Sequence, residues 1–247
     1  MAFAPLNSPT KTLALELAEI ITNAGIYTPR SQQVYMGPSE IGQECIRKMA
    51  YKLLDWEKAN ESGGGNWAAQ IGTAIHSHLE GIFAKYPERF EVEQKVQIRA
   101  NLSGTVDLFD KQTGTVIDWK TTSPASVKTK RSEGATEQQK IQVQLYGYGK
   151  ARQGVQVNQV ALIFLPTGGQ ISDMHVELFD YDESVALKAL ERLDLVYSLL
   201  ATIDVEENPQ MWPLIPATPS RMCNYCPYFR PFSTDLAVAC NGETEPK

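Results

Sequence analysis

The hydrophobic period of this chain changes near residue 90, and that change constrains the fold more than any other feature of the sequence. Before it, apolar residues recur at helical spacing; after it, they alternate or cluster in short runs bounded by turn residues. A spacing of three to four residues indicates an amphipathic helix, whereas alternation indicates a strand with one buried face. The strand-like runs predict a β-meander, and they occupy residues 91–100, 102–110 and 114–122.

Helices are expected both before and after this meander. Helical periodicity precedes it at residues 10–23, 39–56 and 66–85, with a glycine-rich break at 61–65, and follows it at 137–152 and 182–203. Further buried strands are expected at 157–166 and 174–179, and the polar, turn-rich segment 123–136 predicts a mobile loop. The order of helix, meander, helix and strand predicts one mixed α/β sheet with helices packed against it.

The length and composition fit one large globular domain. The chain has 247 residues, of which 43% are hydrophobic, so it can build a sizeable core. Its longest apolar run, residues 160–166, is far shorter than the roughly 18 residues of a membrane span, and its start does not resemble a secretory signal. We therefore expect a cytoplasmic protein with no membrane partner. The net charge of −6 argues against a broad nucleic-acid-coating face, but it is compatible with a local basic channel or with carboxylates gathered around a metal.

Short motifs in the middle of the chain carry side chains that suit metal-assisted chemistry. They contain His76 on a predicted helix, Asp107 in SGTVD, Asp118 and Lys120 in VIDWK, and Gln142 and Tyr146 in QVQLY. Asp107 and Asp118 lie on adjacent predicted strands, so a hairpin could bring both carboxylates to one edge of the sheet. Converging carboxylates suit Mg²⁺ or Mn²⁺, and an imidazole shifts the preference toward manganese. Lys120 shares a strand face with Asp118, which would place it beside a metal-bound water and predicts phosphodiester hydrolysis.

Each of these residue groups also has a simpler structural explanation. A histidine like His76, taken alone, is more often a surface or hydrogen-bonded helix residue than a ligand. Gln142 and Tyr146 have the spacing of a helix-surface pair. The basic residues Lys128, Lys130 and Arg131 fit a solvated loop as well as they fit phosphate contact.

The order of the motifs resembles that of the RecB-like branch of the PD-(D/E)XK nuclease superfamily. GTAIHSHLE, SGTVD, VIDWKTT and QVQLY resemble its four motifs over residues 66–152, although Val106 replaces the proline that names the superfamily. The resemblance implies a restriction-endonuclease-like α/β core at 66–180, with a mixed central sheet, inside a single nuclease domain, 1–247. It also implies a metal-dependent DNA exonuclease acting on ends or single strands in replication, recombination or repair, encoded by a phage or mobile element.

The same resemblance assigns roles to individual residues. It implies that His76, Asp107, Asp118 and the Trp119 carbonyl bind Mg²⁺ or Mn²⁺, and that Lys120 is catalytic together with the two aspartates. Gln142 and Tyr146 would line the site and contact DNA, with Lys128, Lys130 and Arg131 as further DNA-binding candidates. A homo-oligomer or a replication or recombination protein would be a further partner.

Four cysteines form one early and one late group: Cys45, Cys223, Cys226 and Cys240. A reducing compartment favours metal binding over disulfides, and the Cys-x-x-Cys spacing lets two thiolates converge on either zinc or iron. GPSEIGQECIRKMAYKL resembles the upstream segment of iron–sulfur nucleases such as the CRISPR adaptation and AddB-type nucleases. This resemblance implies a [4Fe–4S] cluster joining segments 39–56 and 208–240, with a flexible tail at 241–247; the gap before Cys240 is wider than usual.

Two other functions are consistent with these patterns. One is a non-catalytic DNA-binding or assembly module of the same fold with a zinc or iron–sulfur structural site. The other is a structural protein whose cysteines hold zinc. The intact set of His76, Asp107, Asp118 and Lys120 argues against the first, and metal analysis with a plasmid-degradation assay would separate all three functions.

Overall fold

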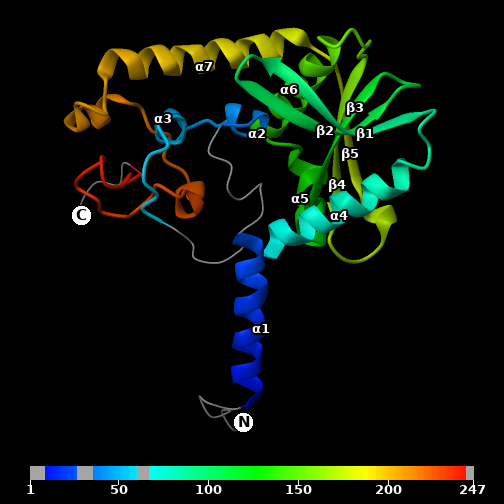
Figure 1. Cartoon of the computed structure of the whole chain (residues 1–247), viewed down its shortest axis with the longest axis horizontal. Coiled ribbons are helices and arrows are strands. Elements are labelled where there is room, and N and C mark those ends of the chain that lie inside the picture. The colour runs from blue at the N-terminus through cyan, green and yellow to red at the C-terminus, as the bar shows by residue number, and fades with distance from the viewer. Residues whose placement is uncertain (1–8, 27–35, 61–66, 243–247) are drawn as a thin grey trace.

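A five-stranded sheet lies on one side of the protein (Figure 1). Its strands follow one another across the sheet in chain order. The computed structural model describes residues 9–26, 36–60 and 67–242. The strands are β1 (Phe90–Arg99), β2 (Leu102–Asp110), β3 (Thr115–Thr122), β4 (Gln159–Pro166) and β5 (His175–Asp180). β1, β2 and β3 form an antiparallel meander, β4 pairs parallel with β3, and β5 pairs antiparallel with β4. The sheet is therefore mixed, which confirms the prediction from the hydrophobic periods.

Helices cover both faces of this sheet because its central strand alternates buried side chains between them. In β3, Val116 packs on the face covered by α6 (Glu137–Ala151). Its neighbours Ile117 and Trp119 belong to the cluster on the face covered by α4 (Trp67–Phe83). The sequence of a strand that is buried on both faces is nearly all apolar. VIDWK fits this pattern apart from its two charged residues.

The segment between β3 and α6 is helical, which corrects the expectation of a mobile loop at 123–136. α5 (Pro124–Glu133) begins after Ser123, whose hydroxyl accepts the Ser126 N–H, and ends at Gly134 with a φ of 78°. Val127 is buried, whereas most other positions are polar, so the sequence has no apolar stripe to reveal the helix. Together α5 and α6 form the long crossover that parallel pairing of β3 with β4 requires.

A second group of elements, here named the cysteine lobe, packs beside the sheet (Figure 1). It consists of α2 (Pro38–Ile41), α3 (Ile46–Leu53), the 3-10 helices η2 (Pro209–Leu214) and η3 (Arg221–Tyr225), and the rest of the chain from 204 to 242. α7 (Glu183–Ile203) connects the sheet to this lobe, and a short 3-10 helix, η1 (Ile171–Asp173), precedes β5.

Aromatic stacking joins the early and late parts of the cysteine lobe. The Tyr51 ring of α3 stacks on Trp212 with 4.0 Å between ring centroids and on Tyr228 with 5.0 Å. The Arg47 backbone N–H donates to the Pro216 carbonyl at 2.9 Å. The lobe therefore depends on contacts between segments that are far apart in the sequence.

The segment predicted as one helix at 39–56 forms two helices instead. α2 ends at Gly42, and Cys45 is the N-cap of α3. A Cβ at Gly42 would lie 2.7 Å from the Cα of Gln138 in α6, so the chain passes too close to α6 for any side chain. Periodicity alone did not show this break because apolar residues continue through it.

α1 (Pro9–Ile26) extends away from the other elements, as Figure 1 shows. It confirms the helix expected at 10–23, but Leu15 and Ile20 are 62% and 65% exposed. The Gln70 amide of α4 donates to its Ile21 carbonyl at 3.1 Å. Among the described helices none is long and apolar enough to cross a membrane. The expected break at 61–65 and most of the expected tail at 241–247 lie outside the described residues.

Candidate active site

The pairing of β2 with β3 stops just before two aspartates. The last paired residues are Leu108 and Ile117, so Asp107 and Asp118 occupy the next positions, where the ladder has ended. The Trp119 N–H therefore donates to a side chain, Asp107 Oδ2, at 2.8 Å. This bond fixes the Asp107 carboxylate at the point where the strands separate, and the two predicted carboxylates do lie on adjacent strands.

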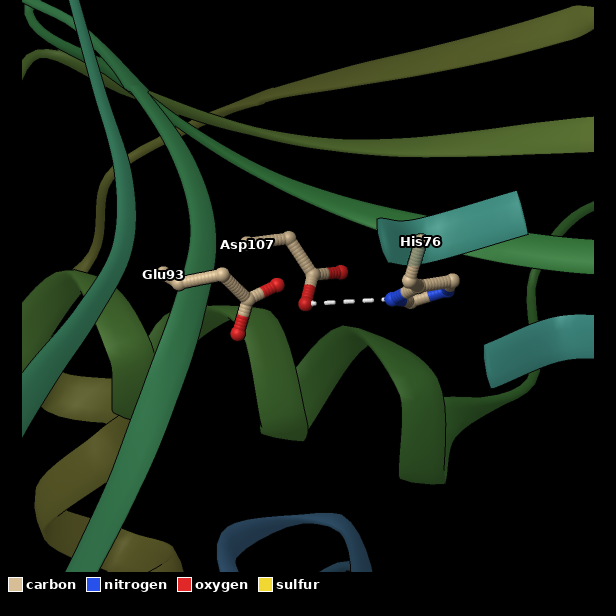
Figure 2. Close-up of side chains that lie close together, drawn as sticks. All are labelled: His76, Glu93 and Asp107. Carbon is tan, nitrogen blue, oxygen red and sulfur yellow. Dashed lines mark ion pairs between the residues drawn. The ribbon is translucent and has the colours of Figure 1, made fainter. Parts of the chain in front are cut away.

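His76 reaches the same point from α4. Its Nδ1 lies 3.4 Å from Asp107 Oδ1, and both side chains are largely buried (Figure 2). An imidazole nitrogen and a carboxylate oxygen at this separation are compatible with neighbouring positions around one divalent cation. The structure thus brings together His76 and Asp107, which the sequence placed on different elements.

Glu93 of β1 is a third donor at this point, and the sequence analysis missed it. One ligand atom from each of His76, Glu93 and Asp107 lies within 4.8 Å of the other two, and Figure 2 shows the Glu93 carboxylate beside that of Asp107. Glu93 belongs to a run that was interpreted only as a strand. Only the register of the folded sheet places it opposite Asp107, because its neighbours pair as Val92 with Leu108 and Gln94 with Val106.

Asp118 and Lys120 form a buried ion pair next to this group. Asp118 Oδ2 lies 2.7 Å from Lys120 Nζ. Carboxylate and imidazole donors that gather in this way are ligands that Mg²⁺ and Mn²⁺ accept, so the residues at this point of the sheet fit a hard divalent ion.

Gln142 and Tyr146 of α6 hold the ion pair in place. Gln142 accepts a hydrogen bond from Lys120 Nζ at 2.8 Å and donates to Asp118 Oδ1 at 3.3 Å. Gln142 also donates to the Tyr146 hydroxyl at 3.0 Å. Both side chains are buried, which rules out the helix-surface pair as an explanation of their spacing.

The electrostatic environment of Asp118 opposes its ionised form. Burial raises the pKa of this carboxyl above its usual range, and the nearby Asp107 carboxylate raises it further, while Lys120 and His76 lower it. These effects show that Asp107, Asp118, His76 and Lys120 interact within one site. A divalent cation added there would favour the ionised carboxylate.

The basic residues expected in a loop lie on α5. Lys128 is exposed. Lys130 Nζ donates to the Gly134 carbonyl at 3.2 Å and lies 5.6 Å from the centre of the Phe164 ring, and Arg131 donates to the Asp173 carbonyl. Phe164 is the register partner of Lys120, so the last turn of α5 lies beside the Lys120 end of β3.

The four cysteines form no disulfide and lie in the cysteine lobe. Burial raises the pKa of the Cys226 thiol, and the Cys240 and Cys45 thiols raise it further. Cys240 Sγ accepts the Gly242 N–H at 3.4 Å, and a Cβ at Gly242 would lie 3.6 Å from Cys223 Sγ. The early cysteine and the three late ones therefore share one lobe.

Across the described residues, no group of three cysteines brings its sulfurs within 4.8 Å of one another.

Several solved structures share this fold. An alkaline exonuclease from Laribacter hongkongensis, LHK-Exo, aligns with a TM-score of 0.52 and 10% identity over 79% of this chain and 100% of that one. The complex of LHK-Exo with dAMP aligns with a TM-score of 0.51 and 11% identity over 80% of this chain and 100% of that one. A phage-related exonuclease from Haemophilus somnus 129PT aligns with a TM-score of 0.49 and 14% identity over 75% of this chain and 87% of that one. At these identities the likeness shows the fold alone.

No curated protein matches the sequence. The family model described as the PD-(D/E)XK nuclease superfamily matches residues 37–230, which include every strand and the whole site at the end of β2 and β3. The chain therefore belongs to the PD-(D/E)XK nuclease superfamily.

Proposed function

We propose that this nuclease is a divalent-metal-dependent DNA exonuclease of the RecB-like branch. The observation that carries the proposal is the convergence of His76 and Asp107 with the buried Asp118–Lys120 pair at the opening between β2 and β3. A non-catalytic module would have no need of a buried Asp118 carboxylate close to a second carboxylate, because burying charge costs free energy.

His76, Asp107, Asp118 and the Trp119 carbonyl would hold Mg²⁺ or Mn²⁺. When bound, such an ion lowers the pKa of water and stabilises negative charge on a phosphoryl oxygen. Lys120 would orient the attacking water and neutralise charge on the scissile phosphate, since its ammonium group is fixed by Asp118 and Gln142. Gln142 and Tyr146 would keep Lys120 in that position.

DNA ends or single strands are the proposed substrates. The fold shared with LHK-Exo, an alkaline exonuclease that was solved in complex with dAMP, supports DNA as the polymer and removal of terminal nucleotides as the reaction. Lys128, Lys130 and Arg131 on α5 would contact phosphates near the Lys120 end of β3. The resemblance to RecB-like nucleases extends the proposal to a role in replication, recombination or repair and to a phage or mobile-element origin.

The cysteine lobe would hold a [4Fe–4S] cluster, with Cys45, Cys223, Cys226 and Cys240 as ligands. Support comes from the placement of the early cysteine in the same lobe as the three late ones, and from the resemblance of residues 37–53 to the upstream segment of iron–sulfur nucleases. The cluster would supply a structural link between α3 and residues 223–240, far from the site at the end of β2.

The decisive experiment digests end-labelled single-stranded and double-stranded DNA with Mg²⁺ or Mn²⁺, with a closed circular duplex as the control substrate. We expect release of nucleotides from linear DNA and an intact circle. Asp118→Ala and Lys120→Ala should each reduce the rate at least about 100-fold, whereas Lys85→Ala, at an exposed position after α4, should not. Wild-type turnover by purified Asp118→Ala protein would refute the proposal.

A further inference from the structure

Glu93 has a backbone conformation that glutamate rarely adopts. Its φ is 48°, in the left-handed region, although it lies inside strand β1. Pairing with β2 continues on both sides, at Val92 with Leu108 and Gln94 with Val106, so the register is kept across the distortion. A non-glycine residue is held in this region only when surrounding structure or a ligand compensates for the strain.

The distortion places the Glu93 carboxylate next to Asp107 rather than away from it. Residue 93 stands opposite residue 107 in the register, and the two carboxylates lie side by side with the His76 imidazole beyond Asp107 (Figure 2). Two neighbouring carboxylates repel each other when both are ionised. A cation between the donors would offset this repulsion.

The separations match those of ligands around one ion. Metal–oxygen bonds of about 2.0–2.1 Å in an octahedron place neighbouring ligand atoms about 3 Å apart and opposite ones about 4.2 Å apart. The donor atoms of His76, Glu93 and Asp107 all lie within 4.8 Å of one another, and the His76–Asp107 separation is 3.4 Å. The Asp118 carboxylate, which Lys120 and Gln142 hold beside this group, is not one of the three donors that gather within this distance.

We infer that Glu93 is a further ligand of the catalytic cation and completes, with His76 and Asp107, the primary coordination group. This inference rests on the proposed metal-dependent nuclease function. It assigns a direct metal contact to β1, a strand that carries none of the motifs. The ion would be held between β1, β2 and α4, and Asp118 would approach it from the side of Lys120.

The test measures Mn²⁺ binding to the full chain by calorimetry and by the Mn²⁺-induced rise in melting temperature, neither of which depends on cleavage. Glu93→Gln, which keeps the shape and removes the charge, should weaken Mn²⁺ binding at least about 10-fold and abolish most of the thermal shift. Glu88→Gln removes the same charge from an exposed position just before β1 and should bind Mn²⁺ like the wild type.

Glu93→Gly keeps the test decisive if Glu93→Gln folds poorly, because glycine accepts the left-handed φ without strain. It should fold at least as stably as the metal-free wild type and also bind Mn²⁺ at least about 10-fold more weakly. Wild-type affinity in a folded Glu93 variant, while Asp107→Asn loses binding, would overturn this inference and leave the proposed function standing. Failure of the wild type itself to bind Mn²⁺ would overturn both.

Discussion

Two aspartates near the β2–β3 hairpin show how the surroundings decide what the same residue type does. The Arg89 guanidinium donates to Asp110, at 2.8 Å from Nη2 to Oδ2, and holds the pKa of that carboxyl below its usual range, assisted by the Gln112 N–H. Burial has the opposite effect on Asp118 and raises its pKa. Asp110 is therefore stabilised in its ionised form by a structural ion pair, whereas a cation bound near Asp118 would stabilise the ionised form of that carboxyl.

Asp110→Asn is predicted to lower the free energy of unfolding by about 1–3 kcal/mol at neutral pH, since it removes a charge-assisted hydrogen bond from a buried position. The folded pKa of Asp110 lies below the unfolded value of about 3.9. The contribution of the ionised Asp110 to stability is therefore complete above that value, and it is lost as the pH falls through the folded pKa. Urea unfolding of wild type and variant at pH 7 and at about pH 3 measures this difference in the free energy of unfolding.

The matched control for this prediction is Asp194→Asn. Asp194 pairs with Arg99 but its side chain is 62% exposed, so the effect should be small at either pH. A deficit in Asp110→Asn that stays equally large in acid would contradict an ionic origin.

At the scale of elements, glycine allows β2 to pack closely against α6 and α2. A Cβ at Gly104, in the SGTVD motif, would lie 2.6 Å from the Tyr146 ring and 2.8 Å from the Pro38 ring. The glycine of one motif thus leaves space for the tyrosine of another. This explains in physical terms why these two short sequences occur together in the chain.

Gly104→Ala is predicted to destabilise the protein by about 1–3 kcal/mol, because the methyl group must displace two rings in a packed region. Gly81→Ala is the control: a Cβ there has no atom within 4 Å, and alanine in helix α4 should stabilise by up to about 1 kcal/mol. Chemical denaturation of both variants gives the two changes in the free energy of unfolding. Equal stability of the two variants would show that the neighbouring rings move readily to make room at Gly104.

The elements that the sequence predicted are those whose pattern is local. The meander, α6, β4 and α7 lie close to the expected ranges because alternation or helical spacing marks them directly. The sequence did not predict α5 because the segment between its caps, Ser123 and Gly134, is polar and has no apolar stripe. It did not predict the break after α2 because the break is caused by close contact with α6, about a hundred residues away in the sequence.

The same reasoning separates the predicted from the missed site residues. Asp107, Asp118 and Lys120 stand in recognisable short motifs, and their convergence required only that β2 and β3 form a hairpin. Glu93 stands in no motif, and its position depends on the register of β1 with β2 and on an unusual φ. Neither quantity can be read from a single sequence.

At the scale of the whole molecule, the cysteine lobe is predicted to contain iron. Protein purified without oxygen should be brown and contain about four irons per chain, as a Cys₄-ligated [4Fe–4S] cluster requires. Cys45→Ser, Cys223→Ser, Cys226→Ser and Cys240→Ser should each lose iron and lower the melting temperature, because the ligands join distant segments. Metal analysis and thermal unfolding measure both effects.

Tyr225→Ala serves as the control, since this residue lies between Cys223 and Cys226 and its side chain is 79% exposed. It should keep its iron. Full iron in Cys240→Ser alone would place the fourth ligand elsewhere, and unchanged metal content in all four cysteine variants would show that the lobe holds no cluster.

The long-range contacts of the cysteine lobe also set an order for folding during synthesis. Tyr51 bonds the Leu236 carbonyl, 185 residues away, and Trp56 bonds the Ala237 carbonyl, 181 residues away. The β1–β3 meander, in contrast, closes through short turns, and local contacts form faster than distant ones. At about 5–20 residues per second, the ribosome needs roughly 6–24 s to pass from the end of β3 to Cys240. A nascent chain can therefore pair the strands that carry Asp107 and Asp118 several seconds before α3 finds its partners.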